Sequence, residues 1–186
     1  VMTYFDDRLK IRPLEADTML AGILIDTMYF TYQTSSKTFD AASFLRKKGA
    51  DSDRVRKLLR VDAEFEKLKN EVVANAKYYK NVYAIAAIEK YDGNIELSVA
   101  KAEIANELID IKGVKASFVL SNENGRYMVS SRSIDEVNVQ VIMEKFGGGG
   151  HRSSAGAQIE AESFDAAIAL ITKAIDEYEV EEGESK

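Results

Sequence analysis

The sequence lacks cysteine altogether, and it holds one proline and one histidine. Without cysteine the chain can form no disulfide, no thiolate metal site and no thiol-based catalytic site. No apolar run approaches the length of a membrane span, and no signal peptide is visible. We therefore expect a cytoplasmic chain that makes no contact with the membrane.

An excess of positive charge is also absent, because 25 Lys and Arg stand against 31 Asp and Glu, for a formal net charge of −6. Proteins that bind long DNA or RNA usually present a basic face, so the composition argues against a long nucleic acid as partner. A small phosphorylated ligand needs only a few local donors and remains allowed. The length of 186 residues suffices for one large domain or two small ones with a real core.

The sequence begins with Val1 instead of an initiator methionine, and an apolar helix is predicted soon after this start. We therefore expect a piece of a longer protein. The first part of the chain, residues 1–80, is predicted to be mainly helical. Apolar residues at helical spacing and local caps predict four helices, over 13–27, 39–49 with Thr38 as cap and Gly49 at the end, 51–60 with Asp51 or Ser52 as cap, and 64–79.

The second part, residues 81–180, alternates strand and helix patterns. A buried strand is predicted at 82–91, a helix at 98–111, and a hairpin around Asn124 and Gly125, which favour a turn with positive φ. A helix at 137–146, a glycine loop, a short strand at 155–162 and a helix capped by Ser163 follow. We therefore predict an α/β fold, in which a helical part precedes a small mixed-sheet domain, with a frayed acidic tail at 181–186.

The stretch GGGGHRSSAGA at 147–157 holds five of the 11 glycines, four of them in a row, and the single histidine. Glycine permits positive φ and lets backbone N–H groups approach an anion closely. An imidazole, a guanidinium and two hydroxyls come directly after these glycines, in a set that suits a phosphate or phosphodiester: His151, Arg152, Ser153 and Ser154. A flexible hairpin loop with an incidental histidine is the alternative.

Two further residues are candidates for chemistry. Asp26 ends a helix with apolar neighbours, where a carboxylate is unfavourable at the negative helix end and costly if buried. A metal ion would resolve both problems, whereas the alternative is an exposed carboxylate at the helix end. Arg132, in SSRS at a strand end, could bind a phosphate through two parallel hydrogen bonds. Its alternative is a surface ion pair with Asp135 or Glu136.

Three motifs stand in a fixed order, AGILIDT, SSRS and GGGGHRSSAG, and this combination resembles the DHH phosphoesterase superfamily. The region from Val82 onward is similar to the DHH-associated domain. A finer match, carried by GILIDT, TFDAASFLRKKGAD, SSRSIDEVNVQVIMEKFGGGGH and the Gln158 that follows, is to cyclic-di-AMP phosphodiesterases of the GdpP type. The stretch HRSSAGA, by contrast, is closer to the general form GGGHxxAAG of the superfamily. The alternatives are therefore a short-oligonucleotide exonuclease, an adenosine-bisphosphate phosphatase, or a non-catalytic module like the domain attached to alanyl-tRNA synthetase.

The resemblance implies roles for these residues. Asp26 would be one ligand of a two-metal Mn²⁺ site, and the substrate-binding set would be Arg132, Gly147, Gly148, Gly149, Gly150, His151, Arg152, Ser153 and Ser154. The other metal ligands of the family, including its Asp-His-His triplet, lie upstream, and this chain contains no such triplet. We therefore expect the chain by itself to be inactive. The expected partners are a cyclic dinucleotide or short oligonucleotide and a second copy in a homodimer, with a parent protein anchored in the membrane.

Overall fold

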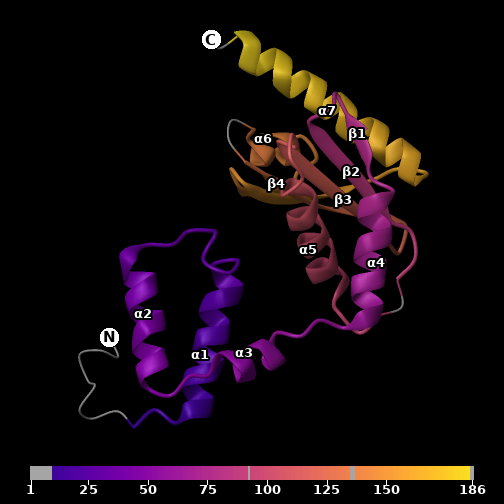
Figure 1. The fold of residues 1–186 in the computed structure, drawn as a ribbon. Coiled ribbons are helices and arrows are strands. Elements are labelled where there is room, and N and C mark those ends of the chain that lie inside the picture. The colour runs from indigo at the N-terminus through magenta and orange to yellow at the C-terminus, as the bar shows by residue number, and fades with distance from the viewer. Residues whose placement is uncertain (1–9, 92, 135–136, 185–186) are drawn as a thin grey trace. The chain divides into compact units, whose positions relative to one another are not determined.

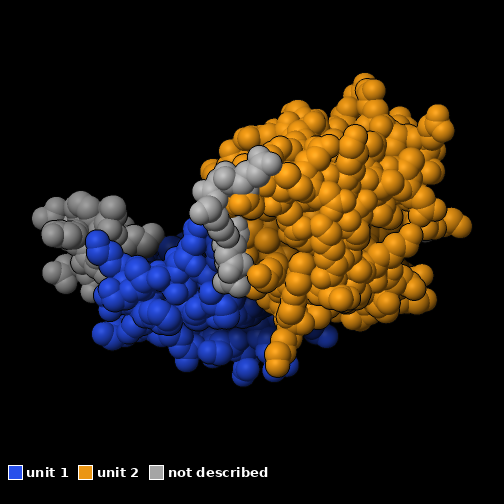
Figure 2. All heavy atoms as spheres, turned by 90° about the horizontal axis from the view of Figure 1, so that it is seen from above, with its two compact units in different colours: residues 1–61 blue, residues 62–186 orange. Residues whose placement is uncertain are grey.

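The computed structural model describes residues 10–91, 93–134 and 137–184. The chain divides into two compact units, unit 1 at residues 1–61 and unit 2 at residues 62–186 (Figures 1 and 2). This division comes before the predicted boundary at residue 80, because helix α4 (Ala63–Ala74) packs with a helix and a strand of unit 2. Each unit has its own apolar core.

The described part of unit 1 contains three helices, α1 (Pro13–Asp26), α2 (Ser36–Lys47) and α3 (Ser52–Leu58). The predicted cap of α2 was wrong by three residues. Ser35 is the N-cap, and the hydroxyl of Thr38 accepts a hydrogen bond from the Ser35 N–H in a capping box. Gly49 follows α2 with φ of +97°, and Asp51 caps α3, as predicted.

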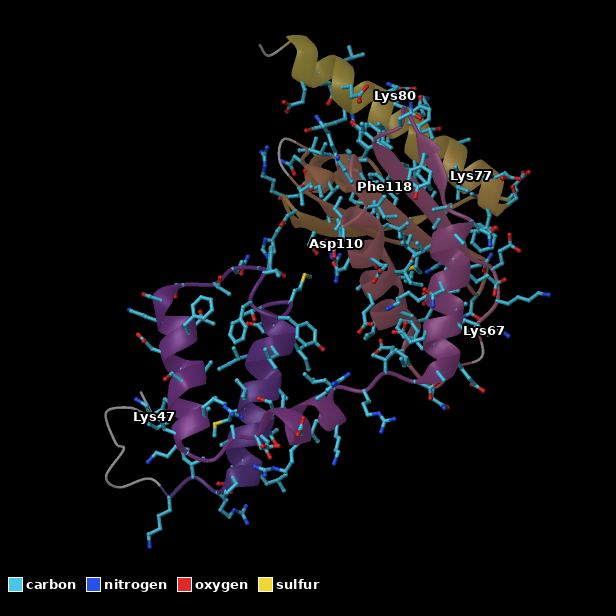
Figure 3. All side chains as sticks on the ribbon, viewed as in Figure 1. Lys47, Lys67, Lys77, Lys80, Asp110 and Phe118 are labelled. Carbon is cyan, nitrogen blue, oxygen red and sulfur yellow. The ribbon has the colours of Figure 1, made fainter. Side chains whose placement is uncertain are left out.

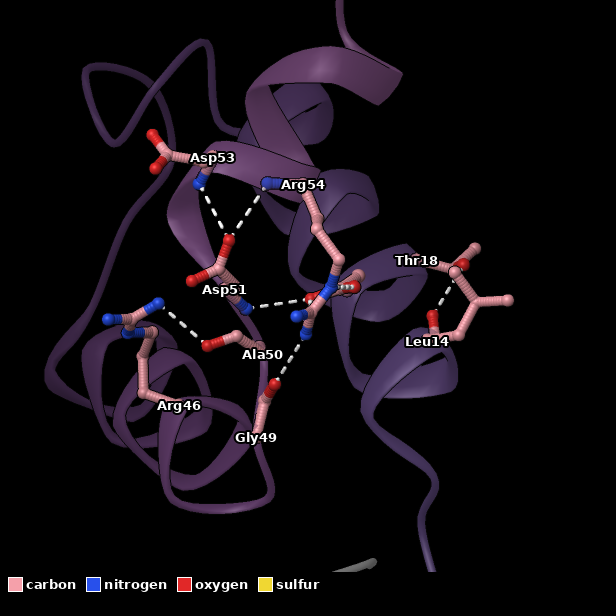
Figure 4. Close-up of polar contacts among 9 residues, drawn as sticks. Leu14, Thr18, Arg46, Gly49, Ala50, Asp51, Asp53 and Arg54 are labelled. Carbon is pink, nitrogen blue, oxygen red and sulfur yellow. Dashed lines mark hydrogen bonds and ion pairs between the residues drawn. The ribbon is translucent and has the colours of Figure 1, made fainter.

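A buried carboxylate joins α1 to the start of α3, where Asp51, Arg54 and Gly49 share in a group of polar contacts (Figure 4). Asp17 is 0% exposed, and its oxygens accept hydrogen bonds from Arg54 Nε at 2.6 Å and from the Asp51 N–H at 2.7 Å. Arg54 also donates to the Gly49 carbonyl at 2.8 Å. The hydrogen bond from Arg54 favours the charged carboxylate and lowers the pKa of Asp17. These contacts supplement a core of six small or medium apolar residues, Ala16, Leu20, Ala21, Leu45, Ala50 and Val55.

The described part of unit 2 is built on one six-stranded sheet in the order β1-β2-β3-β4-β6-β5. The strands are β1 (Lys77–Tyr79), β2 (Tyr83–Ile88), β3 (Ala116–Glu123), β4 (Arg126–Ser133), β5 (Gly149–His151) and β6 (Ser154–Ile159). Strands β2 and β3 are parallel and are joined through α5 (Leu97–Ile109), and the other pairs are antiparallel. The predicted α/β class with a mixed sheet is therefore confirmed.

Helices cover both faces of this sheet (Figure 1). On one face, α6 (Val139–Glu144) and α7 (Phe164–Glu184) form a core with alternate residues of the strands, centred on the fully buried Phe118 (Figure 3). On the other face, α5 packs on β2, β3 and β4, with α4 beside it. Within the described ranges, no helix combines the length and the apolar character needed to cross a membrane.

Two helix predictions at the ends of unit 2 were wrong. The helix predicted over 64–79 stops at Ala74, and the chain turns into the edge strand β1. Residues 181–184, predicted as part of a frayed tail, continue α7 as far as Glu184, and residues 185–186 lie outside the described residues. Ion pairs join the β1 region to α7. Lys80, in the turn after β1, binds carboxylates of Asp176 and Glu179 on α7 at 2.6 Å each, which raises the pKa of the lysine (Figure 3).

Candidate functional site

The glycine run forms a helix end and an edge strand rather than the open loop that the sequence predicts. The N–H groups of Gly147 and Gly148 donate to the carbonyls of Glu144 and Met143, at 2.9 and 3.1 Å, and so terminate α6. Residues 149–151 are strand β5, which pairs with β6. The first two N–H groups are therefore not available to an anion, because the end of α6 already uses them.

The fold itself requires three of the four glycines. Gly147 has φ of +71°, a conformation that favours glycine. A Cβ on Gly148 would lie 2.2 Å from the Gly156 carbonyl oxygen, and a Cβ on Gly150 would lie 2.4 Å from a backbone oxygen of the facing strand. Gly149 differs, since a Cβ there would meet nothing within 4 Å. The fold therefore does not require a glycine at this position, and the open space beside Gly149 leaves room for a ligand.

The two-residue turn between β5 and β6 is anchored by its backbone. The Arg152 carbonyl accepts hydrogen bonds from the Val139 N–H at 3.0 Å and from the Ser133 hydroxyl at 3.1 Å. The Ser153 carbonyl accepts one from the Ser133 N–H at 3.0 Å. This turn is therefore held to the end of β4 and the start of α6, which fixes the position of the neighbouring His151.

Strand register places three predicted residues in one row. Arg132 on β4 pairs with Ser154 on β6, and Ser154 pairs with His151 on β5. Directly opposed residues point to the same face of a sheet. That face is the one under α5, because Ser117, opposite Arg132, donates its hydroxyl to the Ala105 carbonyl of α5 at 2.7 Å. Strands β6 and β5 extend the same face sideways, where Gln158, His151 and Gly149 are exposed.

Two further rows run parallel to this one. Ser130 pairs with Gly156, which pairs with Gly149, and Met128 pairs with Gln158. We call the resulting surface the uncovered face, defined by Arg132, Ser154, His151, Ser130, Gly156, Gly149, Met128 and Gln158. It contains one cation, one imidazole, one amide and a central row with almost no side-chain volume.

Several polar groups on the uncovered face have no partner among the described residues. In the part of the chain that the structure describes, no hydrogen bond or ion pair involves the side chains of Ser130, Ser154, His151 or Gln158. All four are partly or fully exposed, so water satisfies them and a ligand can replace that water. Four unpartnered polar side chains on one small surface are the arrangement expected of a site that binds a polar ligand.

Arg132 is held in place from two directions. Its Nε donates to Asn106 Oδ1 on α5 at 2.9 Å, and its terminal nitrogen donates to the Ser131 carbonyl at 2.9 Å. The alternative pairing with residues 135–136 lies outside the described residues. Sequence reasoning did not identify Asn106 or Ser130 as site residues. The two-residue alternation of polar side chains along β4 could have identified Ser130, which shares a strand face with Arg132.

Asp26 is the last residue of α1 and is exposed, so the argument for a metal that depended on its burial no longer applies. The backbone directly after it is unusual, because Met28, Tyr29 and Phe30 have φ of 44°, 55° and 68°. Among the described residues, no group of three or more His, Cys, Asp or Glu could hold a metal ion. Since Mn²⁺ prefers about six oxygen or nitrogen ligands, these residues do not form a manganese site by themselves.

Comparisons with known proteins agree with this fold. Residues 80–177 match the family model of the DHHA1 domain. The cyclic-di-AMP phosphodiesterase GdpP of Bacillus subtilis (strain 168) is 38% identical over 179 residues, which are 96% of this chain and 27% of that protein. The protein of the same name from Geobacillus thermodenitrificans (strain NG80-2) is 41% identical over 180 residues, with the same two coverages. The chain thus spans 27% of the length of these relatives.

One solved structure is similar over nearly the whole chain. It is an exopolyphosphatase-related protein from Bacteroides fragilis, with a TM-score of 0.80 and 25% identity. The match covers 95% of this chain and 53% of that one. The family model covers more than half of the chain, and the two relatives described above are phosphodiesterases by name. The chain therefore belongs to the DHHA1 family of phosphoesterase domains.

Proposed function

We propose that this chain supplies the substrate-binding surface of a phosphodiesterase that hydrolyses cyclic-di-AMP to linear pApA. The observation that carries the proposal is the row of Arg132, Ser154 and His151 on an exposed sheet face, where two of the three side chains have no partner among the described residues. The names of two relatives, both cyclic-di-AMP phosphodiesterases, support the choice of substrate.

The row offers donors suited to a phosphodiester. The guanidinium of Arg132, oriented by Asn106, supplies a fixed positive charge, and the Ser154 hydroxyl and His151 imidazole can donate hydrogen bonds to phosphate oxygens. Groups that are already positioned stabilise charge that develops on the phosphate without further reorganisation. Gly149, without a side chain, leaves the neighbouring row open for the rest of the nucleotide.

We expect no Mn²⁺-dependent hydrolysis of cyclic-di-AMP by the purified chain. A manganese pair would supply an activated water and stabilise the leaving oxygen, and Asp26 is the one ligand that we propose this chain gives to it. The described residues contain no further cluster of ligands. Incubation with cyclic-di-AMP and Mn²⁺, followed by chromatography for pApA, is the assay. Turnover that Asp26→Asn leaves intact would contradict the assignment of this residue.

The second candidate is a phosphodiesterase for short linear oligonucleotides, which the sequence HRSSAGA favours because it follows the general form of the family. Calorimetric titration of the chain with cyclic-di-AMP and, separately, with pApA distinguishes the two. Tighter binding of the cyclic ligand supports the proposed function. Tighter binding of the linear ligand supports the second candidate.

A further inference from the structure

We propose that Gln158 recognises the edge of an adenine base and so determines which nucleobase the site accepts, an inference that rests on the proposed function. Gln158 is exposed on β6, on the uncovered face, and its amide has no hydrogen-bond partner among the described residues. It lies four residues beyond Ser154 on the same strand face, at a distance of about 13 Å along the strand. An extended nucleoside monophosphate has a comparable length.

The surface between these two positions suits a planar ring. The central row consists of Ser130, Gly156 and Gly149. It separates the row that contains Arg132, Ser154 and His151 from the pair Met128 and Gln158. Three adjacent strands at about 4.8 Å spacing give this row a width of roughly 10 Å, with hardly any side chain above it. Met128, directly opposite Gln158, is half-buried and offers a thioether, which makes favourable contacts with aromatic rings. A purine can therefore lie flat on this row while its phosphate contacts Arg132 and His151.

The chemistry of the amide selects adenine over guanine. A glutamine side chain can accept a hydrogen bond from N6 of adenine while it donates one to N7. Guanine presents two acceptors, O6 and N7, on the same edge, so one half of the amide would face a group that it cannot bond. The site should therefore prefer adenine nucleotides by about fivefold or more.

The test is an NMR titration of the ¹⁵N-labelled chain with 5′-AMP, 5′-GMP and ribose 5-phosphate, in the millimolar range. The side-chain NH₂ signal of Gln158 is assigned by its loss in Gln158→Ala. We expect AMP to shift this signal together with the backbone signals of Gly149 and Gly156. Ribose 5-phosphate should shift only signals of the Arg132 row. Gln158→Ala should weaken the binding of AMP about fivefold or more and abolish the preference for AMP over GMP. The affinity for ribose 5-phosphate should not change.

Gln140→Ala is the matched control. Gln140 lies on α6, on the opposite side of the sheet, and its amide already donates to Glu144 at 2.8 Å. This variant should bind AMP like the unchanged chain. If AMP and ribose 5-phosphate shift the His151 signals but Gln158→Ala keeps affinity and preference, the assignment of Gln158 is wrong and the proposed function stands. If neither ligand shifts any signal on the uncovered face, both are wrong.

Discussion

Replacing Gly148 with alanine should abolish ligand binding and lower the thermal unfolding midpoint. The new Cβ would lie 2.2 Å from the Gly156 carbonyl oxygen and 2.6 Å from the Ala157 Cβ, so strand β5 would have to move away from β6. Such overpacking typically costs about 1–3 kcal/mol. Because β5 carries His151, the displacement would also break the row that binds the phosphate. Circular dichroism and calorimetry with cyclic-di-AMP measure the two effects.

Gly149→Ala is the matched variant next to it. A Cβ at Gly149 meets no atom within 4 Å, so the free energy of unfolding should change by less than about 0.5 kcal/mol. The methyl group would nevertheless lie on the uncovered face, where Gly149 pairs with Gly156, and should weaken the binding of cyclic-di-AMP. A Gly149→Ala chain that binds cyclic-di-AMP like the unchanged chain would show that the ligand does not approach this row.

In unit 1, Asp17→Ala should lower the melting temperature of the helices by several degrees. Asp17 is fully buried and accepts hydrogen bonds from Arg54 and from the Asp51 N–H. Removing the buried carboxylate takes the acceptor from the Asp51 N–H and from Arg54, whose side chain is half exposed, and leaves a gap in a small core. A donor that loses its partner and a cavity both destabilise a fold. Far-UV circular dichroism and limited proteolysis of residues 10–61 measure the loss.

Asp53→Ala serves as the control for this change. Asp53 also carries a carboxylate at the start of α3, but it lies in the first turn after the N-cap Asp51 and is exposed. Its removal should leave the unfolding midpoint nearly unchanged. Equal effects of the two substitutions would show that burial of Asp17 does not hold α1 to α3.

Local signals in the sequence predicted those elements that short segments determine by themselves. Pro13 begins α1, Asp51 caps α3, and the residues Asn124 and Gly125, with φ of 56° and 84°, form the predicted hairpin turn. The helix predicted over 64–79 was wrong at its end because β1 exists through pairing with β2, which the local pattern does not contain. Tertiary pairing overrides helical propensity in such a segment.

The candidate site was predicted in part. The residues of the Arg132 row were predicted from their chemistry, but the shape of the glycine run was not, because the end of α6 and the pairing with β6 determine it. The contact between Asn106 and Arg132 joins residues 26 positions apart, and no local spacing signals it. The flat central row became visible only from the register of three strands.

Calorimetric titration of cyclic-di-AMP into the unchanged chain and into His151→Ala tests the central claim, that the uncovered face is a nucleotide-binding site. Lys173→Ala, which changes an exposed residue of α7 on the opposite side of the sheet, is the control. We expect the unchanged chain and the control to bind cyclic-di-AMP, and His151→Ala to lose this binding. Equal binding by all three chains, or binding by none of them, would contradict it.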